Sequence, residues 1–422
     1  MPEYLAPGVY VEEVPSTIKP IAGVSTSTAG FVGIVPNNVT MPAQPGKFKM
    51  TPAVGNTPAA VERDSVTGEP VPLPYTVAAA NEPQPINSWG EFTQKFGEIQ
   101  TVNAYLAHAV YGFFNNGGSR CWVIRVTAVG NVAAALAKFE GIDEIAIVAA
   151  PLPHDTTAAA LNPIHAALVT HCQNAEDRVA ILDSMRDIKN DNLVISTDDS
   201  GIWRPAANPK GYGAFYFPWI EVADPLQPAG TRIAVPPSGH LAGIYARSDA
   251  ERGVHKAPAN EVVLGALGVK YRVSKILQAS LNPRGVNCIR PFDGTIKVYG
   301  GRTLASDPAG DPEWTYISTR RLFNFLRESI DEGTQWVVFE PNSELLWAKI
   351  RRNLTAFLTN VWASGALHGT TPEQAFYVRC DADTNPSAVR DLGQVVTEIG
   401  VAVVKPAEFV VFRVSQWAGT GQ

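Results

Sequence analysis

Apolar and polar positions alternate most clearly in the C-terminal third of the 422-residue chain. Apolar residues recur there every three or four positions, which is the period of an amphipathic helix. The pattern predicts one helix at Leu322–Ile330, ended by Gly333, and a second at Leu346–Leu358. Runs rich in β-branched and aromatic residues predict strands. These strands are Gln335–Glu340, Ala375–Asp381, Val395–Val404 and Glu408–Gln416.

The middle of the chain alternates between strand-like and helix-like patterns. Strands are expected at Cys121–Val126, Ile145–Ala150, Val179–Asp183, Ala214–Trp219 and Arg232–Val235. Helices are expected at Trp89–Phe96, at Val102–Phe114 and in a segment that ends near Gln173, with Pro163 in its first turn. This alternation is typical of βαβ units, so we predict an α/β fold class, with mixed α+β character over several domains.

Proline divides the chain into regions. Four prolines within residues 1–20 exclude a helix from most of that stretch, which is expected to be an extended arm. From residue 36 to 85 prolines are dense and periodicity is lost, which indicates an inserted loop or small surface decoration. The expected domains are the arm at 1–20, an α/β domain at 21–35 and 86–290, the insertion at 36–85, and a C-terminal domain at 291–422 with a terminal strand.

Composition narrows the class of protein. The length and the 45% hydrophobic fraction predict two or three domains. The net charge of -6 disfavours binding to nucleic acid or anionic lipid, because both need a basic surface. The N-terminus lacks a secretory pattern, and no apolar run is long enough to span a bilayer. The four cysteines are scattered and are expected to be reduced thiols in a cytoplasmic protein.

Motifs for enzymatic chemistry are missing from the sequence, including a phosphate-binding loop, a zinc-protease motif and a nucleophile elbow. Ser238, His240 and Asp249 could form a catalytic triad, but a triad depends on geometry, and a polar, hydrogen-bonded loop is favoured at Ser238–His240. His165 and His171 are six positions apart on one expected helix, so they do not share a metal-binding face. Solvated or capping histidines are expected instead. We therefore predict no catalytic residue, no metal site and no cofactor.

A basic cluster falls on the two C-terminal helices. Its members are Arg320, Arg321, Arg327, Lys349, Arg351 and Arg352. One interpretation is a pair of solvated helix faces with local acidic partners such as Glu328 and Asp331. The other is an electrostatic docking face for an acidic protein partner.

Both ends of the chain carry short apolar strand patterns. The N-terminal one is Val9, Tyr10, Val11, Glu12, Glu13 and Val14, and the C-terminal one is Phe409, Val410, Val411, Phe412, Arg413 and Val414. Such strands either close a sheet within their own subunit or pair with a neighbouring copy, because an unpaired apolar strand promotes aggregation. The proline-rich arm favours pairing between copies, since it is built to reach away from its own core.

Several of these stretches resemble the contractile tail sheath proteins of phage tails and phage-derived injection systems. The resemblance rests on Pro7–Val14, Phe114–Val126, Arg321–Trp347 and Glu398–Gln416, and on the turn at Gly300–Leu304. The matches occur in the expected order over nearly the whole chain, and those in the C-terminal third are the most specific.

The resemblance implies a subtilisin-like α/β middle domain without a working protease and an inner domain made from both chain ends. It also implies a helical homopolymer of stacked six-membered rings around an inner tube protein, with baseplate and cap or terminator proteins at its ends. The sheath would assemble in the cytoplasm, contract on a baseplate signal and drive the tube through an envelope, with the basic cluster facing the tube. A degenerate serine hydrolase and a monomeric binding module remain as alternatives, and a phage tail is not distinguished from a cellular injection system.

Overall fold

The protein is described here from a computed structural model, which places residues 20–53, 59–152, 157–188, 193–196, 200–306 and 312–412. The described residues form two compact units. The larger unit contains residues from 24 to 326 and from 404 onward, and the smaller one contains residues up to 23 and from 327 to 403. The prediction of a C-terminal domain that starts at residue 291 is wrong, because a strand of the larger unit, Val286–Phe292, runs across that position.

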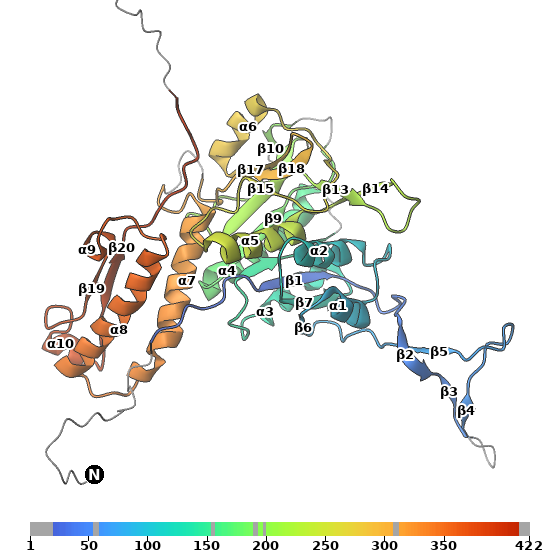
Figure 1. Ribbon diagram of the computed structural model, residues 1–422, viewed down its shortest axis with the longest axis horizontal. Helices are drawn as coiled ribbons and strands as arrows, with labels where there is room; N and C mark the ends of the chain where they lie inside the picture. The colour runs from blue at the N-terminus through green and yellow to red at the C-terminus, as the bar shows by residue number, and fades with distance from the viewer. Residues whose placement is uncertain are drawn as a thin grey trace, which may run out of the picture. The chain divides into compact units, whose positions relative to one another are not determined.

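A mixed sheet is the centre of the larger unit (Figure 1). Among the described residues its strands lie in the order β15 (Glu261–Val262), β18 (Thr295–Tyr299), β17 (Val286–Phe292), β12 (Gly213–Phe217), β9 (Val179–Asp183), β8 (Ile147–Ala149), β1 (Ala29–Ile34), β7 (Cys121–Val126) and β6 (Gln84–Ile86). The strands from β17 to β7 are parallel to one another, and β15, β18 and β6 are antiparallel to their neighbours. The predicted α/β class with mixed character is confirmed.

Helices cover both faces of this sheet, which explains why its central strands are apolar on both sides. On one face lie α1 (Trp89–Phe96), α2 (Ala104–Asn115) and α5 (Ser238–Arg252), and on the other lie α3 (Val132–Ala137) and α4 (Ala158–Ala175). Successive side chains of β1 alternate between the two cores, with Phe31 in the first and Val32 in the second. Helices α2 and α5 approach closely through glycine, since a Cβ at Gly239 would lie 2.3 Å from the backbone of Ala109.

Smaller elements complete the larger unit. They are β2 (Ala43–Phe48) with β5 (Pro72–Pro74), β3 (Met50–Thr51) with β4 (Ala60–Val61), β10 (Ile195–Ser196) with β11 (Ile202–Trp203), the sheet of β14 (Arg232–Val235), β13 (Ile220–Ala223) and β16 (Gly268–Val269), and helix α6 (Lys275–Leu281). Strands β2 to β5 extend away from the central sheet (Figure 1). They occupy the region expected to be an insertion, and their side chains are largely exposed.

The smaller unit begins within α7 (Ile317–Thr334), which crosses the boundary between residues 326 and 327. It continues through α8 (Glu344–Ala363), α9 (Pro372–Ala375), β19 (Phe376–Arg379), α10 (Ser387–Arg390) and β20 (Glu398–Val401). Ser343 caps α8, because its hydroxyl accepts a hydrogen bond from the amide of Leu346. Ile21, near the start of the chain, also belongs to this unit. Its side chain packs so closely on Gly333 that a Cβ added at Gly333 would lie 2.7 Å from it.

Most predicted elements are confirmed, and two of these predictions are wrong. Gln335–Glu340 is not a strand. Gln335–Val337 forms a short 3-10 helix directly after α7, and the indole Nε1 of Trp336 donates to the carbonyl of Gly333. Pro163 is the sixth residue of α4 and not in its first turn, because the helix begins earlier, at Ala158. None of the described helices combines the length and apolarity required to cross a bilayer.

Candidate assembly site

A glutamate anchors the C-terminal segment to the larger unit. Arg302 donates to both carboxylate oxygens of Glu408, with Nη2 2.7 Å from Oε2 and Nε 2.9 Å from Oε1. Asn282 Nδ2 donates to Oε1 at 2.5 Å, and the hydroxyl of Tyr316 donates to Oε2 at 3.0 Å. We call Arg302, Asn282 and Tyr316 the Glu408 cradle. The side chains of Arg302 and Glu408 are only 15% and 19% exposed, so solvent screens this pair weakly.

The cradle is itself held in place by its neighbours. Asn287, which is fully buried on β17, donates to the carbonyl of Arg302 and accepts from its amide, both at 2.7 Å. Burial alone would raise the pKa of Glu408, but the hydrogen bonds from Arg302 and Asn282 outweigh burial, and the pKa is lowered. Glu408 is therefore ionised, and each hydrogen bond to its charge contributes about 1.5–3 kcal/mol.

An exposed apolar segment follows directly after this anchor. Phe409, Val410, Val411 and Phe412 are 73%, 69%, 78% and 85% exposed. Across the part of the chain that the structure describes, these residues pair with no strand. A contiguous apolar segment of this kind requires a partner, because it otherwise promotes aggregation. Arg413 and Val414, the rest of the predicted strand, and the arm from Val9 to Val14 lie outside the described residues.

Strands β19 and β20 offer backbone edges to which a strand could add. They pair antiparallel, from Phe376 opposite Val401 to Arg379 opposite Glu398. Among the described residues neither strand has a second strand beside it, so each keeps one row of amide and carbonyl groups on its outer side. The side chain of Tyr377 on β19 is 59% exposed. Such edges bind an added strand through main-chain hydrogen bonds.

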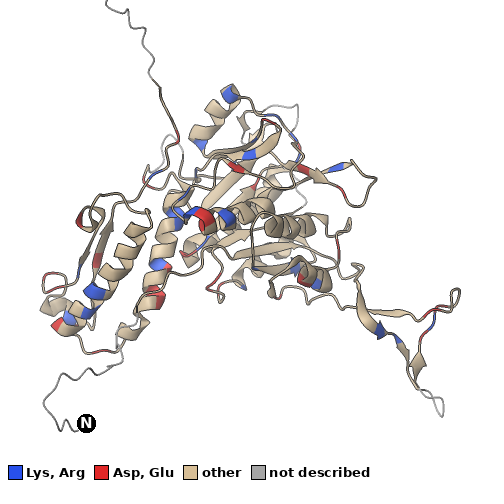
Figure 2. Ribbon diagram, in the orientation of Figure 1, with Lys and Arg blue, Asp and Glu red and all other residues tan. Residues whose placement is uncertain are grey.

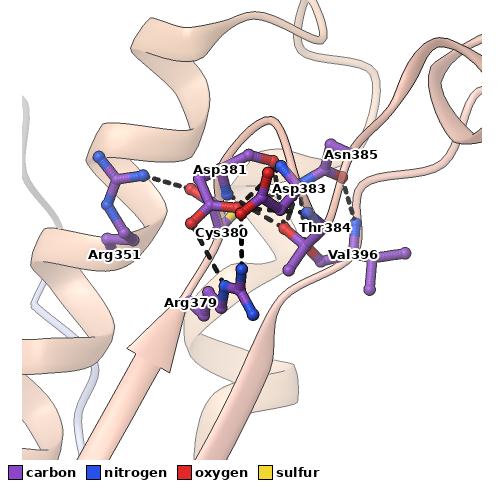
Figure 3. Close-up of polar contacts among 8 residues, drawn as sticks. All are labelled: Arg351, Arg379, Cys380, Asp381, Asp383, Thr384, Asn385 and Val396. Atoms are coloured by element: carbon purple, nitrogen blue, oxygen red, sulfur yellow. Dashed lines mark hydrogen bonds and ion pairs between the residues drawn. The ribbon is translucent and has the colours of Figure 1, made fainter.

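Figure 3 shows the polar contacts that fold the connection between these two strands. Asn385 closes it, donating to the carbonyl of Val396 at 3.0 Å and accepting from its amide at 2.6 Å. Arg351 on α8 donates to the carbonyl of Cys380, which ties the end of β19 to that helix. Asp381 accepts from two backbone amides, and Arg379 pairs with the carboxylates of both Asp381 and Asp383. These carboxylates therefore shape the loop that holds β19 beside β20.

The predicted basic docking face is only partly available. Arg320 and Arg321 are 7% and 3% exposed inside the larger unit, so their assignment as tube-facing residues is wrong. Arg320 lies over the rings of Tyr212 and Trp314, with its Cζ 4.6 Å and 4.1 Å from their centroids. Arg321 is neutralised by Asp249, with Nη2 2.6 Å from the carboxylate.

The other members of the basic cluster lie in the smaller unit. Arg351 is half-buried through its bond to Cys380, whereas Arg327, Lys349 and Arg352 are exposed. Lys349 and Arg352 are exposed and three residues apart, so they share one face of α8. Figure 2 colours basic positions along this helix blue. This exposed face also carries Leu345, which is 77% exposed.

Ser238, His240 and Asp249 do not form a triad. All three lie on α5, so the prediction of a loop at Ser238–His240 is wrong. Residues two apart on a helix do not face each other, and eleven residues separate Ser238 from Asp249 by about 16 Å at the usual rise. The hydroxyl of Ser238 donates instead to buried Asp183 at 2.5 Å. The serine hydrolase alternative thus loses the geometry that it requires.

His165 and His171 are both buried, so the prediction of solvated or capping side chains is wrong. His165 stacks on Trp203 with 5.5 Å between ring centroids, and burial lowers its pKa to about 3. Burial also lowers the pKa of His171 to about 4, with Arg178 nearby adding to the effect. Both rings are therefore neutral parts of the core. The described residues hold no group of three or more His, Cys, Asp or Glu side chains arranged to bind a metal ion.

Replacing Asp183 by asparagine is expected to remove a pH dependence of stability. Burial raises the pKa of Asp183 to about 7, against the lowering effect of its bonds to Ser238. Because the folded pKa lies above the unfolded value, stability is lost as pH rises from about 4 to about 7. In Asp183→Asn the side-chain oxygen can accept from the amide of Ser238 and the side-chain NH2 group can donate to the Ser238 hydroxyl oxygen, so both contacts are kept by a group that carries no charge. Relative to wild type, it should be unchanged at pH 4 and gain on the order of 2–4 kcal/mol in free energy of unfolding at pH 8. Denaturant unfolding at pH 4 and pH 8 measures this. The prediction is contradicted if the free energy of unfolding changes by the same amount between the two pH values in wild type and in Asp183→Asn.

Two family models match this chain. The phage tail sheath protein central domain matches residues 127–304, and the phage tail sheath C-terminal domain matches residues 309–416. Together they cover about two thirds of the sequence, including the Glu408 cradle and the β19–β20 sheet. The chain belongs to the phage tail sheath family. The resemblance seen in the sequence is confirmed.

Curated relatives of this sheath chain come from a prophage and from a phage. A prophage major tail sheath protein of Pseudomonas aeruginosa is 27% identical over 235 residues, which cover 53% of this chain and 56% of the relative. The tail sheath protein of Vibrio phage KVP40 is 27% identical over 180 residues, covering 42% of this chain and 26% of the phage protein. The chain thus matches about half of the length of the Pseudomonas protein and about a quarter of the length of the Vibrio phage protein.

Solved sheath structures match almost end to end. The contracted helical sheath of the anti-feeding prophage has a TM-score of 0.71 and 28% identity, covering 98% of this chain and 99% of that chain. A chain of the anti-feeding prophage baseplate structure gives the same values. One of these structural neighbours is thus a contracted helical sheath, and the other is a chain of a baseplate structure.

Sequence reasoning did not identify the Glu408 cradle as a functional feature of this sheath protein. Glu408 falls within Glu398–Gln416, which enters the sequence analysis as a predicted strand region and as part of the family resemblance. One signal was present: Glu408 is a lone charge between Pro406-Ala407 and a fully apolar run. A charge at that place requires a partner, but Arg302 lies 106 positions away along the chain.

Proposed function

We propose that this chain is the structural sheath subunit of a contractile tail or injection system. Subunits polymerise as stacked six-membered rings around an inner tube in a metastable extended state. Contraction then drives the tube through a target envelope. The observation that carries the proposal is the exposed apolar segment Phe409–Phe412. Among the described residues it pairs with no strand, and the β19–β20 sheet has no third strand beside it.

Strand exchange between copies would link the subunits. The C-terminal strand, Phe409–Val414, adds to the β19–β20 sheet of a neighbouring copy, and the arm at Val9–Val14 supplies a second strand. Backbone hydrogen bonds give the affinity, and the alternation of side chains sets the register. Because the donor and acceptor surfaces differ, the contact is heterologous and propagates as a helix rather than closing as a dimer.

The work of contraction would come from the subunit contacts and not from a catalytic reaction. Larger buried contacts in the contracted state provide the free energy, and a kinetic barrier preserves the extended state. Subunits move as rigid bodies while the exchanged strands keep neighbouring subunits connected. This role requires no cofactor, no nucleotide and no enzymatic activity.

The inner tube, the baseplate and a cap or terminator protein are the proposed partners besides other copies of this chain, with no contact to nucleic acid or membrane. Assembly takes place in the cytoplasm. An injection system or a compact tail is favoured, because the anti-feeding prophage sheath chain is covered over 99% of its length.

Electron microscopy of the purified chain with its cognate tube protein tests this function. Wild-type protein should form hollow, striated tubes. A variant without residues 1–14 should remain folded and monomeric, since it lacks one exchanged strand. Particles of monomer size in the wild-type sample, with the tube protein present, would contradict the proposal.

Reversing the charges of Lys349 and Arg352 to glutamate should uncouple the sheath from the tube. Both side chains are exposed on one face of α8, and complementary charge directs the docking of protein surfaces. Co-sedimentation with tube protein at low salt should fall at least tenfold. The matched control reverses Lys47, which is exposed on β2, and Lys49, which directly follows β2 and is half-buried. Equal co-sedimentation of both double variants would exclude α8 as the docking face.

A further inference from the structure

Glu408 occupies a particular place along the chain. Val403 is the last residue tied to the smaller unit, through its bridge to Leu367. Only four residues separate it from Glu408, which is bound in the larger unit. The next residue, Phe409, begins the exposed apolar segment. Glu408 therefore marks the boundary between residues 404–408, which end bound to the larger unit, and the exposed apolar segment that begins at Phe409.

We propose that Glu408 is a positioning residue that fixes the origin of the exchanged C-terminal strand on the larger unit and takes the load placed on that strand. The proposal rests on the proposed sheath function. The partner is a second copy of this chain, and the cradle of Arg302, Asn282 and Tyr316 is the fixed point from which the strand reaches it.

The first argument concerns the length of free chain. With Glu408 bound, the exchanged strand can begin only at residue 409. Without the anchor it begins at residue 404, and five additional residues of about 3.3–3.6 Å each become free. Each of them must be ordered again when the strand binds a neighbour, which weakens binding. The cradle thus presents the strand already confined near one origin.

The second argument concerns load. A pull on residues 409–414 that reached β20 would separate it from β19 one hydrogen bond at a time, from Val401 toward Glu398. The cradle lies before β20 on that route. The bidentate contact from Arg302 to Glu408 must break together with the contacts from Asn282 and Tyr316. Asn287 holds the backbone of Arg302, because its side chain bonds to both the amide and the carbonyl of that residue. A pull on the strand is therefore transferred to the nine-stranded sheet.

The anchor can be removed without damaging either core. Glu408 contributes hydrogen bonds and the ion pair with Arg302, and it belongs to neither apolar cluster. Glu408→Ala should therefore still fold, but with a thermal midpoint below that of wild type, because these polar contacts are lost. Glu340→Ala is the matched control, because Glu340 is an exposed carboxylate in the smaller unit.

Two measurements on these variants test the proposal. Hydrogen exchange of the unassembled chain should be at least tenfold faster in Glu408→Ala for the peptide 398–408, which includes the amide of Ala402 bonded to Ala375. Assembly on tube protein should need at least tenfold more subunit. Glu340→Ala should match wild type in both.

Each other outcome is decisive. Unchanged exchange in Glu408→Ala would show that the cradle does not hold the segment. Faster exchange with normal assembly would show that the anchor does not position the strand. If wild-type protein forms no tubes with its tube partner, the proposed sheath function is wrong. The mechanical role of Glu408 is then wrong too, whatever the exchange rates are.

Discussion

Replacing Arg321 by methionine is expected to destabilise the larger unit by about 3–5 kcal/mol. Arg321 on α7 and Asp249 on α5 form a buried ion pair, at 3% and 6% exposure, with nitrogen–oxygen distances of 2.6 Å and 2.8 Å. The hydroxyl of Thr26 also donates to Asp249, and Arg321 donates to the carbonyl of Thr26. Removing the cation leaves a carboxylate buried without its charge partner, which is far more costly than losing an exposed pair.

Denaturant unfolding measures this change. Arg272→Met is the control, because Arg272 is exposed in the same unit and its loss should change the free energy of unfolding by less than about 0.5 kcal/mol. In Arg321→Met with Asp249→Asn, part of the loss should be recovered, since no buried charge remains. Equal stability of Arg321→Met and Arg272→Met would contradict the assignment of Arg321 to the core.

Proline at Val411 should abolish polymerisation on the tube while leaving the monomer folded. Val411 is 78% exposed and lies in the middle of the proposed exchanged strand. Proline removes the backbone donor and fixes φ, so the strand cannot complete a ladder with a neighbouring sheet. The monomer makes no use of this segment among its described contacts, so its thermal midpoint should not change.

Val411→Thr is the matched variant for this experiment. It keeps the β-branched shape and the backbone amide, so assembly should continue at a reduced yield. Striated tubes from Val411→Pro in wild-type amount would show that Val411 makes no inter-subunit backbone bond.

The sequence predicted the central sheet well because its strands are short, apolar and bounded by turns. Cys121–Val126 and Val179–Asp183 match β7 and β9 residue for residue. Periodicity also located α7 and α8, but it could not say which charges on them are exposed. Arg321 follows the polar pattern of its helix, and only the tertiary structure brings it to Asp249, 72 positions away.

The candidate assembly site was predictable only where local sequence determines it. The apolar run from Phe409 has no charge on either face until Arg413, which was enough to suggest an unpaired strand. The cradle, in contrast, is assembled from the end of α6, the turn after β18 and the residue before α7. No local pattern links these positions, because the central sheet and its helices bring them together.

A cryo-EM reconstruction of the assembled sheath tests the central claim most directly. The account predicts that residues 409–414 form a strand on the β19–β20 sheet of a neighbouring copy, with Glu408 still bound to Arg302 of its own chain. A reconstruction in which residues 409–414 fold back onto their own subunit, with both outer edges of β19–β20 free of any strand from another copy, would contradict it.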